Sequence, residues 1–336
     1  MRQPFSCEQR AKRTYLHVHL AVAARNAICQ RHMFSADQSQ AENKSPQLCC
    51  AANFALQPAA GFFTIAITKE EIMSLADTVF INMCKDIIEN GTSTEGEKVR
   101  PVWEDGTPAY TIKRFGVVNR YDLRKEFPAL TLRKTALKSA MDEILWIWQK
   151  KSNNIHDLHS HIWDSSIGKA YGYQMSVKHQ YREGMMDQVD RVLYDLKNNP
   201  YSRRIMTNIY VHQDLHEMNL YPCAYSMTFN VTKEKGKDKL TLNAVLNQRS
   251  QDILAANNWN VCQYSILLMM FAQVCGMEAG ELLHVIADCH IYDRHVPVVK
   301  ELIQRTPYEA PAVRLNPEIK NFYDFTVDDL IVENYQ

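Results

Sequence analysis

The sequence predicts one α+β domain over residues 73–336, in which helices pack against a mixed or antiparallel sheet. Three observations carry this prediction. The chain is 46% apolar and 10% aromatic, which is enough for a sizeable core. Segments with helical periodicity are interspersed with segments in which apolar residues recur at every second position. Two of these alternating segments, 223–231 and 240–247, flank a polar stretch centred on Gly236, which is typical of an antiparallel hairpin.

The first 68 residues differ in composition from the rest of the chain. They are rich in Ala, Gln, Ser and Cys, show no sustained period, and hold seven Lys/Arg against three Asp/Glu. We expect residues 1–72 to form a poorly structured extension or to lie upstream of the natural start, for which Met73 is suited. An organelle-import peptide and an RNA-binding tail are weaker alternatives.

The other helices and strands are predicted from the spacing of apolar residues and from the residues that end helices or form turns. Segment 74–90 is amphipathic and ends at Gly91, which suits a helix C-cap. Asp105 and Gly106 form a turn signal, and strand-like alternation follows them. Further helices are expected at 134–150, 184–199, 259–275 and 279–285, and further strands at 205–211 and 324–335. The longest apolar run, 266–277, contains a glutamine and is too short to cross a bilayer, so it is expected to be a buried helix.

Charge and cysteine content limit the classes of partner and the compartment. The net charge is formally zero, which gives no indication of bulk attraction to nucleic acid or membranes. The nine cysteines are odd in number and include no C-x-x-C pair, so neither a disulfide framework nor a zinc site is expected. Asp288, Cys289, His290 and His295 match no standard zinc spacing. We expect a reducing compartment, the cytoplasm, and no metal.

A thiol stands at the start of the first hairpin strand. In YPCAYSMTFNV, Cys223 and the odd-numbered residues after it are expected to share one face. Pairing that is symmetric about Gly236 would place Arg249 directly opposite Cys223. A guanidinium beside the thiol would lower its pKa and favour the thiolate that attack on an electrophilic carbon requires. The alternative is that Cys223 only packs and Arg249 is a solvated strand end.

Three further features suggest a polar site. Glu143 lies on an otherwise apolar helical stripe, where burial would tune a carboxylate for proton transfer; the alternative is a surface glutamate at the edge of that stripe. Arg203 and Arg204 lie in a turn and could clamp a phosphate, although adjacent loop arginines are usually solvated. If 287–295 is a strand, three polar residues suited to binding hydroxyl groups share one face: Asp288, His290 and Tyr292.

Ten segments, in family order, resemble the thymidylate synthase family. They are DGTPAYT, EILWIW, IWD (162–164), AYGYQ, NNPYSRR, PC (222–223), NQRSQD (247–252), WNVCQY (259–264), DCHIY (288–292) and FYDFTVDDL (322–330). The resemblance implies the family's α+β fold and a sheet-mediated, obligate homodimer. It also implies reductive methylation of dUMP to dTMP with 5,10-methylenetetrahydrofolate, which becomes dihydrofolate.

The resemblance assigns catalytic roles to four residues. Cys223 would add to C6 of uracil, which makes C5 nucleophilic enough to take the one-carbon unit. Glu143 would organise water and proton transfer, and Arg249 would be the catalytic arginine. Asn260 would hydrogen-bond the pyrimidine edge. An amide there favours uracil over cytosine, because the related deoxycytidylate hydroxymethylases carry aspartate at this position.

The resemblance also implies the binding residues and the dimer. The nucleotide would be bound by Arg100, Gln248, Arg249, Ser250, Asn260, His290 and Tyr292, and the folate by Trp163, Tyr171 and Asp252. Arg203 and Arg204 would complete the phosphate site of the other subunit, so that one subunit could not complete its own clamp. No membrane partner and no nucleic-acid partner are expected.

The sequence departs from the family pattern in several places. Ala224 stands where a histidine often follows the nucleophile, Ser166 where a second pocket tryptophan is common, and Ala256 where glycine is often found. The sequence stops at VENYQ, before the apolar tail that usually closes the folate site. We therefore expect binding of nucleotide but slow turnover until such a tail is restored. The alternatives are a pyrimidine-monophosphate hydroxymethylase of the same fold and a catalytically weak nucleotide-binding paralogue.

Overall fold

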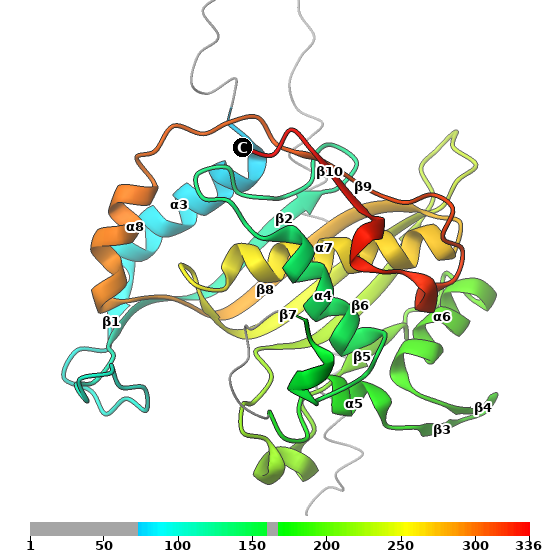
Figure 1. Cartoon of the computed structure of the whole chain (residues 1–336), viewed down its shortest axis with the longest axis horizontal. Helices are drawn as coiled ribbons and strands as arrows, with labels where there is room; N and C mark the ends of the chain where they lie inside the picture. Colours follow the sequence, from blue (N-terminus) through cyan, green and yellow to red (C-terminus); the bar gives the residue numbers. More distant parts are fainter. Residues whose placement is uncertain (1–72, 160–166) are drawn as a thin grey trace, which may run out of the picture. The chain divides into compact units, whose positions relative to one another are not determined.

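The computed structural model describes residues 73–159 and 167–336. The extension expected at 1–72 lies outside the described residues, and so do Trp163 and Ser166. Within the described part, a mixed sheet and a set of helices form the α+β arrangement that the sequence predicts (Figure 1).

The main sheet has six strands in the order β1-β2-β8-β7-β6-β5. All neighbouring strands are antiparallel except β7 and β8, which are parallel and are connected through a helix. The strands are β1 (Thr92–Ser93), β2 (Thr111–Asp122), β5 (Met206–Asn208), β6 (Ala224–Thr232), β7 (Thr241–Asp252) and β8 (Glu278–Tyr292). Two small hairpins pair β3 (His179–Tyr181) with β4 (Gly184–Met186) and β9 (Ala312–Leu315) with β10 (Leu330–Glu333).

The helices are α3 (Leu75–Asn90), α4 (Leu137–Trp148), α5 (Gly172–Ser176), α6 (Gln188–Asn198), α7 (Asn257–Val274) and α8 (Val296–Leu302). Short 3-10 turns lie at η1 (Ile155–Asp157), η2 (His212–Glu217), η3 (Asp293–His295), η4 (Phe322–Asp324) and η5 (Val327–Asp329). The Ser74 hydroxyl accepts a hydrogen bond from the Asp77 amide and so caps the start of α3. Gly91 ends α3 in an extended conformation, where a Cβ atom would lie 2.3 Å from the Ile87 carbonyl oxygen.

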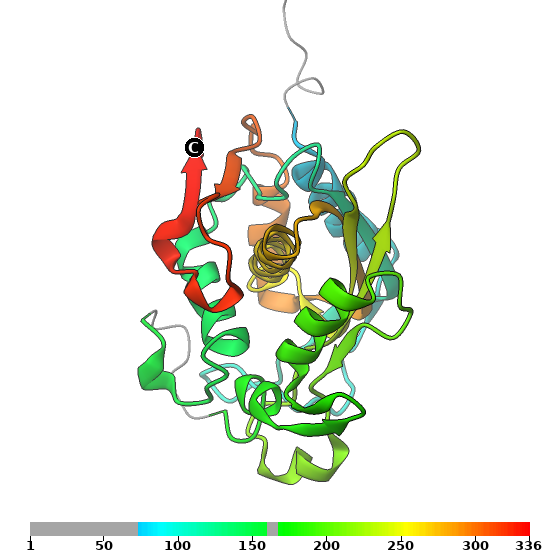
Figure 2. The same cartoon turned by 90° about the vertical axis from the view of Figure 1, so that its right-hand side faces the viewer.

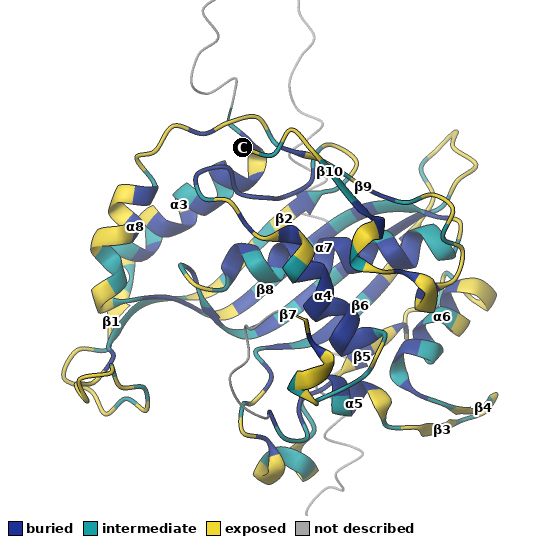
Figure 3. Cartoon of the chain, viewed as in Figure 1, coloured by how far each residue is buried: buried dark blue, intermediate teal, exposed yellow. Residues whose placement is uncertain are grey.

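Helix α7 is the centre of the larger core. It packs against α4 on one side and against β7 and β8 on the other, and Figure 2 shows it nearly end-on between them. Most of its residues are buried around the full circumference, as expected for a helix without a polar stripe (Figure 3). The Phe271 ring stacks on Phe322 at 4.7 Å between centroids and meets Phe229 edge-on at 5.3 Å. The apolar run that the sequence predicted to be a buried helix is therefore this core.

The helix predicted at 279–285 is wrong, because these residues belong to β8. Inward-facing Leu282, His284 and Ile286 are fully buried, and the residues between them are also mostly apolar and half-buried. With both faces apolar, the period of two is hidden, and pairing with β2 and β7 decides the structure. Two further predicted elements are only partly correct. Residues 184–186 of the predicted helix 184–199 form β4, and the final strand is confined to β10.

The hairpin of β6 and β7 has the expected partners but a different register. From Ser226 to Thr232 the pairing is displaced by one residue from symmetry about Gly236. A bulge at Tyr225 then restores the symmetric pairing, so that Ala224 lies opposite Gln248. The bulge also reverses the faces of the strand. The buried odd-numbered positions predicted from the alternation are found only from Met227 onward.

Candidate functional site

A cavity of about 500 Å³ lies where β7 and β8 end and α7 begins. Because β7 and β8 are parallel, their carboxyl ends meet at the same edge of the sheet. The Cys223 end of β6 and the middle of α4 contribute further walls. The structure brings together eleven of the fourteen site residues predicted from the sequence: Arg100, Glu143, Tyr171, Cys223, Gln248, Arg249, Ser250, Asp252, Asn260, His290 and Tyr292.

The thiol of Cys223 lies beside a fixed guanidinium. Nη2 of Arg249 is 3.7 Å from Sγ, and the Arg249 amide donates to the Cys223 carbonyl oxygen at 3.0 Å. The same guanidinium donates to the carbonyl oxygens of Pro222 and Tyr221 at 3.0 and 2.7 Å, which hold its position. The Cys223 amide donates to the hydroxyl oxygen of buried Tyr171 at 3.2 Å. The predicted pairing of Cys223 with Arg249 is therefore present, although the bulge and not a symmetric hairpin produces it.

The predicted lowering of the thiol pKa is wrong. Burial raises the pKa of Cys223, and this effect exceeds the opposing effect of the Arg249 and Arg100 guanidinium groups. The guanidinium groups act in the expected direction, but desolvation of the sulfur is the larger cause. The thiol is therefore protonated near neutral pH, and ionisation has to accompany attack by the sulfur.

This balance predicts the pH dependence of alkylation. We expect the rate of Cys223 alkylation by iodoacetamide to rise with pH through a midpoint above the ordinary thiol value of about 8.5, since only the thiolate reacts. Arg249→Gln removes a group that lowers the pKa, so its midpoint should lie at still higher pH. Peptide mass spectrometry at a series of pH values measures both. A wild-type midpoint below 8.5, or no change in the variant, would contradict this account.

The Glu143 carboxylate is buried at one wall of the cavity. Its side chain is 7% exposed, so the surface alternative does not apply. The indole Nε1 of Trp259, at the start of α7, donates a hydrogen bond to Glu143 Oε2 at 2.6 Å. This role of Trp259 was not predicted from the sequence, although the residue lies in the segment WNVCQY. A single tryptophan does not indicate which carboxylate its indole will reach across 116 positions.

The indole N–H predicts an effect of Trp259→Phe on turnover. The phenyl ring keeps most of the packing but loses the donor, so the carboxylate loses one charge-assisted hydrogen bond. We expect kcat to fall roughly 10- to 100-fold with little change in KM for the substrate that binds in this cavity. Trp146→Phe is the control, since the Trp146 indole donates to the Asn154 carbonyl oxygen away from this cavity. A raised KM with unchanged kcat would show that Trp259 serves only as a wall.

The amide of Asn260 is held by a network of buried glutamines. Its oxygen accepts from Gln248 Nε2 at 3.1 Å and from Gln251 Nε2 at 3.4 Å. Its Nδ2 donates to Gln263 Oε1 at 3.0 Å. His284 extends the network, with Nε2 lying 2.7 Å from Gln248 Oε1. Asn260 keeps one N–H for a ligand, and its oxygen can accept from a ligand in place of the long contact from Gln251, which suits an edge that offers both a donor and an acceptor.

The end of β8 supplies a second polar group. His290 Nδ1 lies 2.8 Å from Asp288 Oδ1, and Lys113 Nζ binds the other carboxylate oxygen at 2.9 Å. The His290 and Tyr292 rings meet edge-on at 5.2 Å, and both side chains line the cavity. The predicted face is therefore a strand face, on which the Asp288 carboxylate orients the His290 ring through this contact.

Arg203 and Arg204 do not reach the Cys223 cavity within one chain. They are exposed in the link between α6 and β5 and line a separate cavity with Arg191 and Glu183. In the described part of the chain, no carboxylate lies within ion-pair distance of either guanidinium. Both are therefore available to a group that this chain does not supply.

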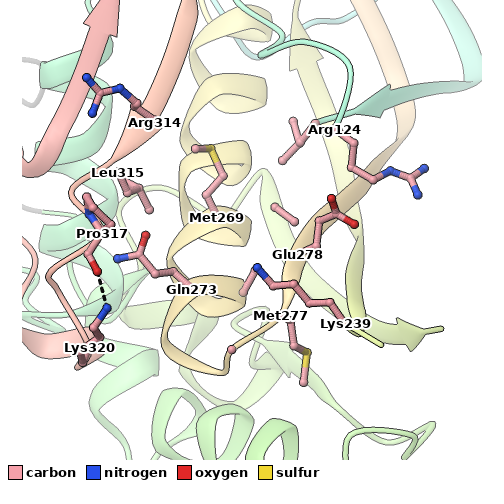
Figure 4. A pocket seen from close by; sticks show the side chains of 14 residues that line it. Arg124, Lys239, Met269, Gln273, Met277, Glu278, Arg314, Leu315, Pro317 and Lys320 are labelled. Atoms are coloured by element: carbon pink, nitrogen blue, oxygen red, sulfur yellow. Dashed lines mark hydrogen bonds between the residues drawn. The ribbon is translucent and has the colours of Figure 1, made fainter. Parts of the chain in front are cut away.

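Another cavity, of about 510 Å³, lies at the far end of α7 (Figure 4). Arg124, Lys239, Arg314 and Lys320 surround it. Arg124 pairs with Asp122 and Glu234, and Arg314 pairs with Glu333. The remaining positive charges lie beside the carboxyl-terminal end of a helix, where cations are stabilised. No thiol lines this cavity, so it does not share the chemistry of the Cys223 site.

Within residues 73–159 and 167–336, no helix is long and apolar enough to cross a membrane. No group of three or more His, Cys, Asp or Glu residues is placed to hold a metal ion there.

The comparisons with known proteins agree with one another. A family model described as thymidylate synthase matches residues 78–336. The chain is 43% identical over 275 residues to thymidylate synthases of Bacillus subtilis subsp. natto and of Bacillus phage phi3T, covering 79% of this chain and 96% of each relative. The solved structure of thermostable thymidylate synthase A from Bacillus subtilis superposes with a TM-score of 0.71 at 42% identity, covering 77% of this chain and 95% of that one.

Proposed function

The chain belongs to the thymidylate synthase family, and from this premise we propose that the Cys223 cavity is its active site. The reaction is the reductive methylation of dUMP to dTMP, with 5,10-methylenetetrahydrofolate as cosubstrate and dihydrofolate as product. One observation carries the assignment to this cavity. A thiol, a fixed guanidinium and an oriented amide face the same space.

Cys223 begins the reaction by forming a bond to C6 of the uracil. The sulfur electron pair enters at C6, and the C5–C6 pair moves toward C5 and O4. C5 then attacks the methylene carbon of the cosubstrate, and the bond from that carbon to one of its two folate nitrogens breaks. Loss of the C5 proton and of the second folate nitrogen leaves an exocyclic methylene group. Hydride transfer from the reduced pterin converts it into methyl, the S–C6 bond breaks, and the folate leaves oxidised by two electrons.

The roles of the other cavity residues follow from these reaction steps. The Arg249 charge offsets the cost of forming a thiolate at a buried sulfur. Glu143, held by Trp259, would move protons through water beside the base. Asn260 would donate to O4 and accept from N3–H. Arg100, Gln248 and Ser250 would bind the nucleotide, with His290 and Tyr292 at the sugar hydroxyl. Tyr171 and Asp252 would contact the folate, as would Trp163, which lies outside the described residues.

Asn260 also decides between the two pyrimidine reactions. Uracil presents N3–H as a donor and O4 as an acceptor, and an amide matches both. A carboxylate, which the deoxycytidylate hydroxymethylases have there, would only accept. The amide therefore favours uracil over cytosine in this cavity.

We also propose that residues 73–336 form the catalytic domain and act as a homodimer in the cytoplasm. Large apolar side chains are exposed on the sheet at Phe115, Val118 and Met206, which suits contact with a second copy. In such a dimer, Arg203 and Arg204 of each subunit would reach the phosphate of the other. A reducing compartment keeps the Cys223 thiol free for catalysis.

The test is a product balance. Incubation with dUMP and 5,10-methylenetetrahydrofolate should give dTMP and dihydrofolate in equal amounts and should release tritium from C5-labelled dUMP. A hydroxymethylated nucleotide without dihydrofolate would instead identify a hydroxymethylase. Binding of dUMP without tritium release would identify a nucleotide-binding paralogue.

A further inference from the structure

An imidazole lies in the middle of β8, between inward-facing residues that are apolar. His284 is 0% exposed, and its strand partners are Leu246 on β7 and Asn119 on β2. Burial lowers the pKa of His284 to about 3, so the ring is neutral at working pH. Its Nδ1 is buried without a partner in the described part of the chain. An apolar ring at this position would avoid the free-energy cost of burying Nδ1 without a hydrogen bond. The hydrogen bond made by Nε2 therefore accounts for a histidine here.

The hydrogen-bond partners fix which atoms of the network carry protons. Gln248 Nε2 donates to the backbone carbonyl oxygen of Ser250 at 3.3 Å, and a carbonyl can only accept. The amide nitrogen of Gln248 must therefore lie on that side, and its Oε1 must face His284. Since Oε1 is an acceptor, the neutral imidazole carries its proton on Nε2 and donates it across 2.7 Å.

The orientation of Gln248 determines that of the Asn260 amide. Gln248 Nε2 also donates to Asn260 Oδ1, so that oxygen is held toward Gln248 and the Asn260 nitrogen toward Gln263. A flipped Asn260 amide would set its N–H groups against the N–H group of Gln248, whereas Gln263 could turn to match it, because Gln263 Nε2 has no partner in the described part of the chain. The side chain is therefore locked in one of its two orientations.

That orientation matters because uracil and cytosine offer inverted edges. Uracil donates from N3 and accepts at O4, whereas cytosine accepts at N3 and donates from N4. A locked Asn260 amide matches only one of them, and a freely flipping amide could pair with either. The discrimination therefore depends on whatever prevents the flip.

We propose that His284 is a positioning residue that determines base specificity, because its Nε2–H acts together with the Ser250 carbonyl oxygen to fix Gln248 and, through it, the Asn260 amide. This proposal rests on the proposed function, in which Asn260 reads the pyrimidine. His284 itself lies outside the cavity wall and touches no reacting atom.

The test compares three substitutions of His284. His284→Gln places an amide N–H near the position of Nε2, His284→Asn places the same group near Nδ1, and His284→Phe removes the donor. We expect His284→Gln to keep the wild-type preference for dUMP over dCMP. His284→Asn and His284→Phe should reduce that preference at least about tenfold, which is the scale of one misplaced hydrogen bond. The measurements are kcat/KM with each nucleotide and the dissociation constants of both by calorimetry.

Leu282→Met is the packing control, since Leu282 is equally buried on the same strand face but makes no polar contact. It should lower the melting temperature and leave the preference unchanged. The proposal is wrong if His284→Phe or soluble His284→Asn discriminates as the wild type does, or if Leu282→Met loses discrimination equally. If the wild type makes no dTMP, the proposed function fails instead, and the dissociation constants still decide whether His284 controls the choice of base.

Discussion

Replacing Cys223 with serine is expected to lower kcat by at least about 10⁴-fold, as removal of a catalytic nucleophile does in other enzymes. A hydroxyl is a much weaker acid than a thiol, and the Arg249 guanidinium at 3.7 Å is not sufficient to ionise it. The volume change is small, and the Cys223 amide keeps its hydrogen bond to Tyr171. Binding of dUMP should therefore change little. Dihydrofolate formation measures the first effect, and calorimetry measures the second.

A covalent assay makes this prediction sharper. With 5-fluoro-dUMP and the cosubstrate, the wild type should form an adduct that survives denaturation, because fluorine cannot leave C5 as a proton does. Mass spectrometry should place that adduct on Cys223, and Cys223→Ser should form none. Cys275→Ser is the matched control, since Cys275 is a free thiol at the far end of α7. An adduct at another residue, or equal turnover in Cys223→Ser, would refute the assignment.

Local patterns predicted much of the fold. The helix from 74 to 90 and the buried helix from 259 to 275 are present within two residues at each end. The amphipathic period and caps of the first helix, and the long apolar run of the second, are local properties of the sequence. The segment 279–285 was wrongly assigned to a helix, and its inward-facing Leu282 and His284 alternate with mostly apolar residues, so the period of two does not stand out. Only the strand pairing with β2 and β7 distinguishes a strand from a helix here, and that pairing depends on residues far away in the sequence. The bulge at Tyr225 was hidden for the same reason.

For the candidate site, too, some residues were predictable from the sequence and others were not. Residues in recognisable segments, such as Cys223, Arg249 and Asn260, are brought together as the sequence indicated. Their supporting contacts were not predictable, because Trp259 and His284 act through side chains of distant elements. A buried histidine between apolar strand residues was the available signal for His284. The net pKa shift of Cys223 was also missed, since sequence gives the neighbouring charge but not the extent of burial.

Mixing two inactive variants is expected to restore activity. Arg203→Ala/Arg204→Ala should lower kcat/KM for dUMP at least about 100-fold, because two charge-assisted contacts to phosphate are lost. Cys223→Ser is inactive for a different reason. Both arginines lie outside the Cys223 cavity of their own chain, so a two-fold dimer would supply them across the interface. In a mixed dimer, one active site then has both an intact thiol and intact arginines.

The amount of recovered activity follows from the symmetry. When equal amounts of the two variants are unfolded and refolded together, about half of the dimers are mixed, and each has one complete site of two. The mixture should therefore show about a quarter of the wild-type activity. Refolding Cys223→Ser with a chain that carries all three substitutions should give none, since no pocket then has a thiol. If the arginines instead bound the phosphate of their own chain, every Cys223-containing pocket in the first mixture would lack them, and activity would stay at the level of the variants alone.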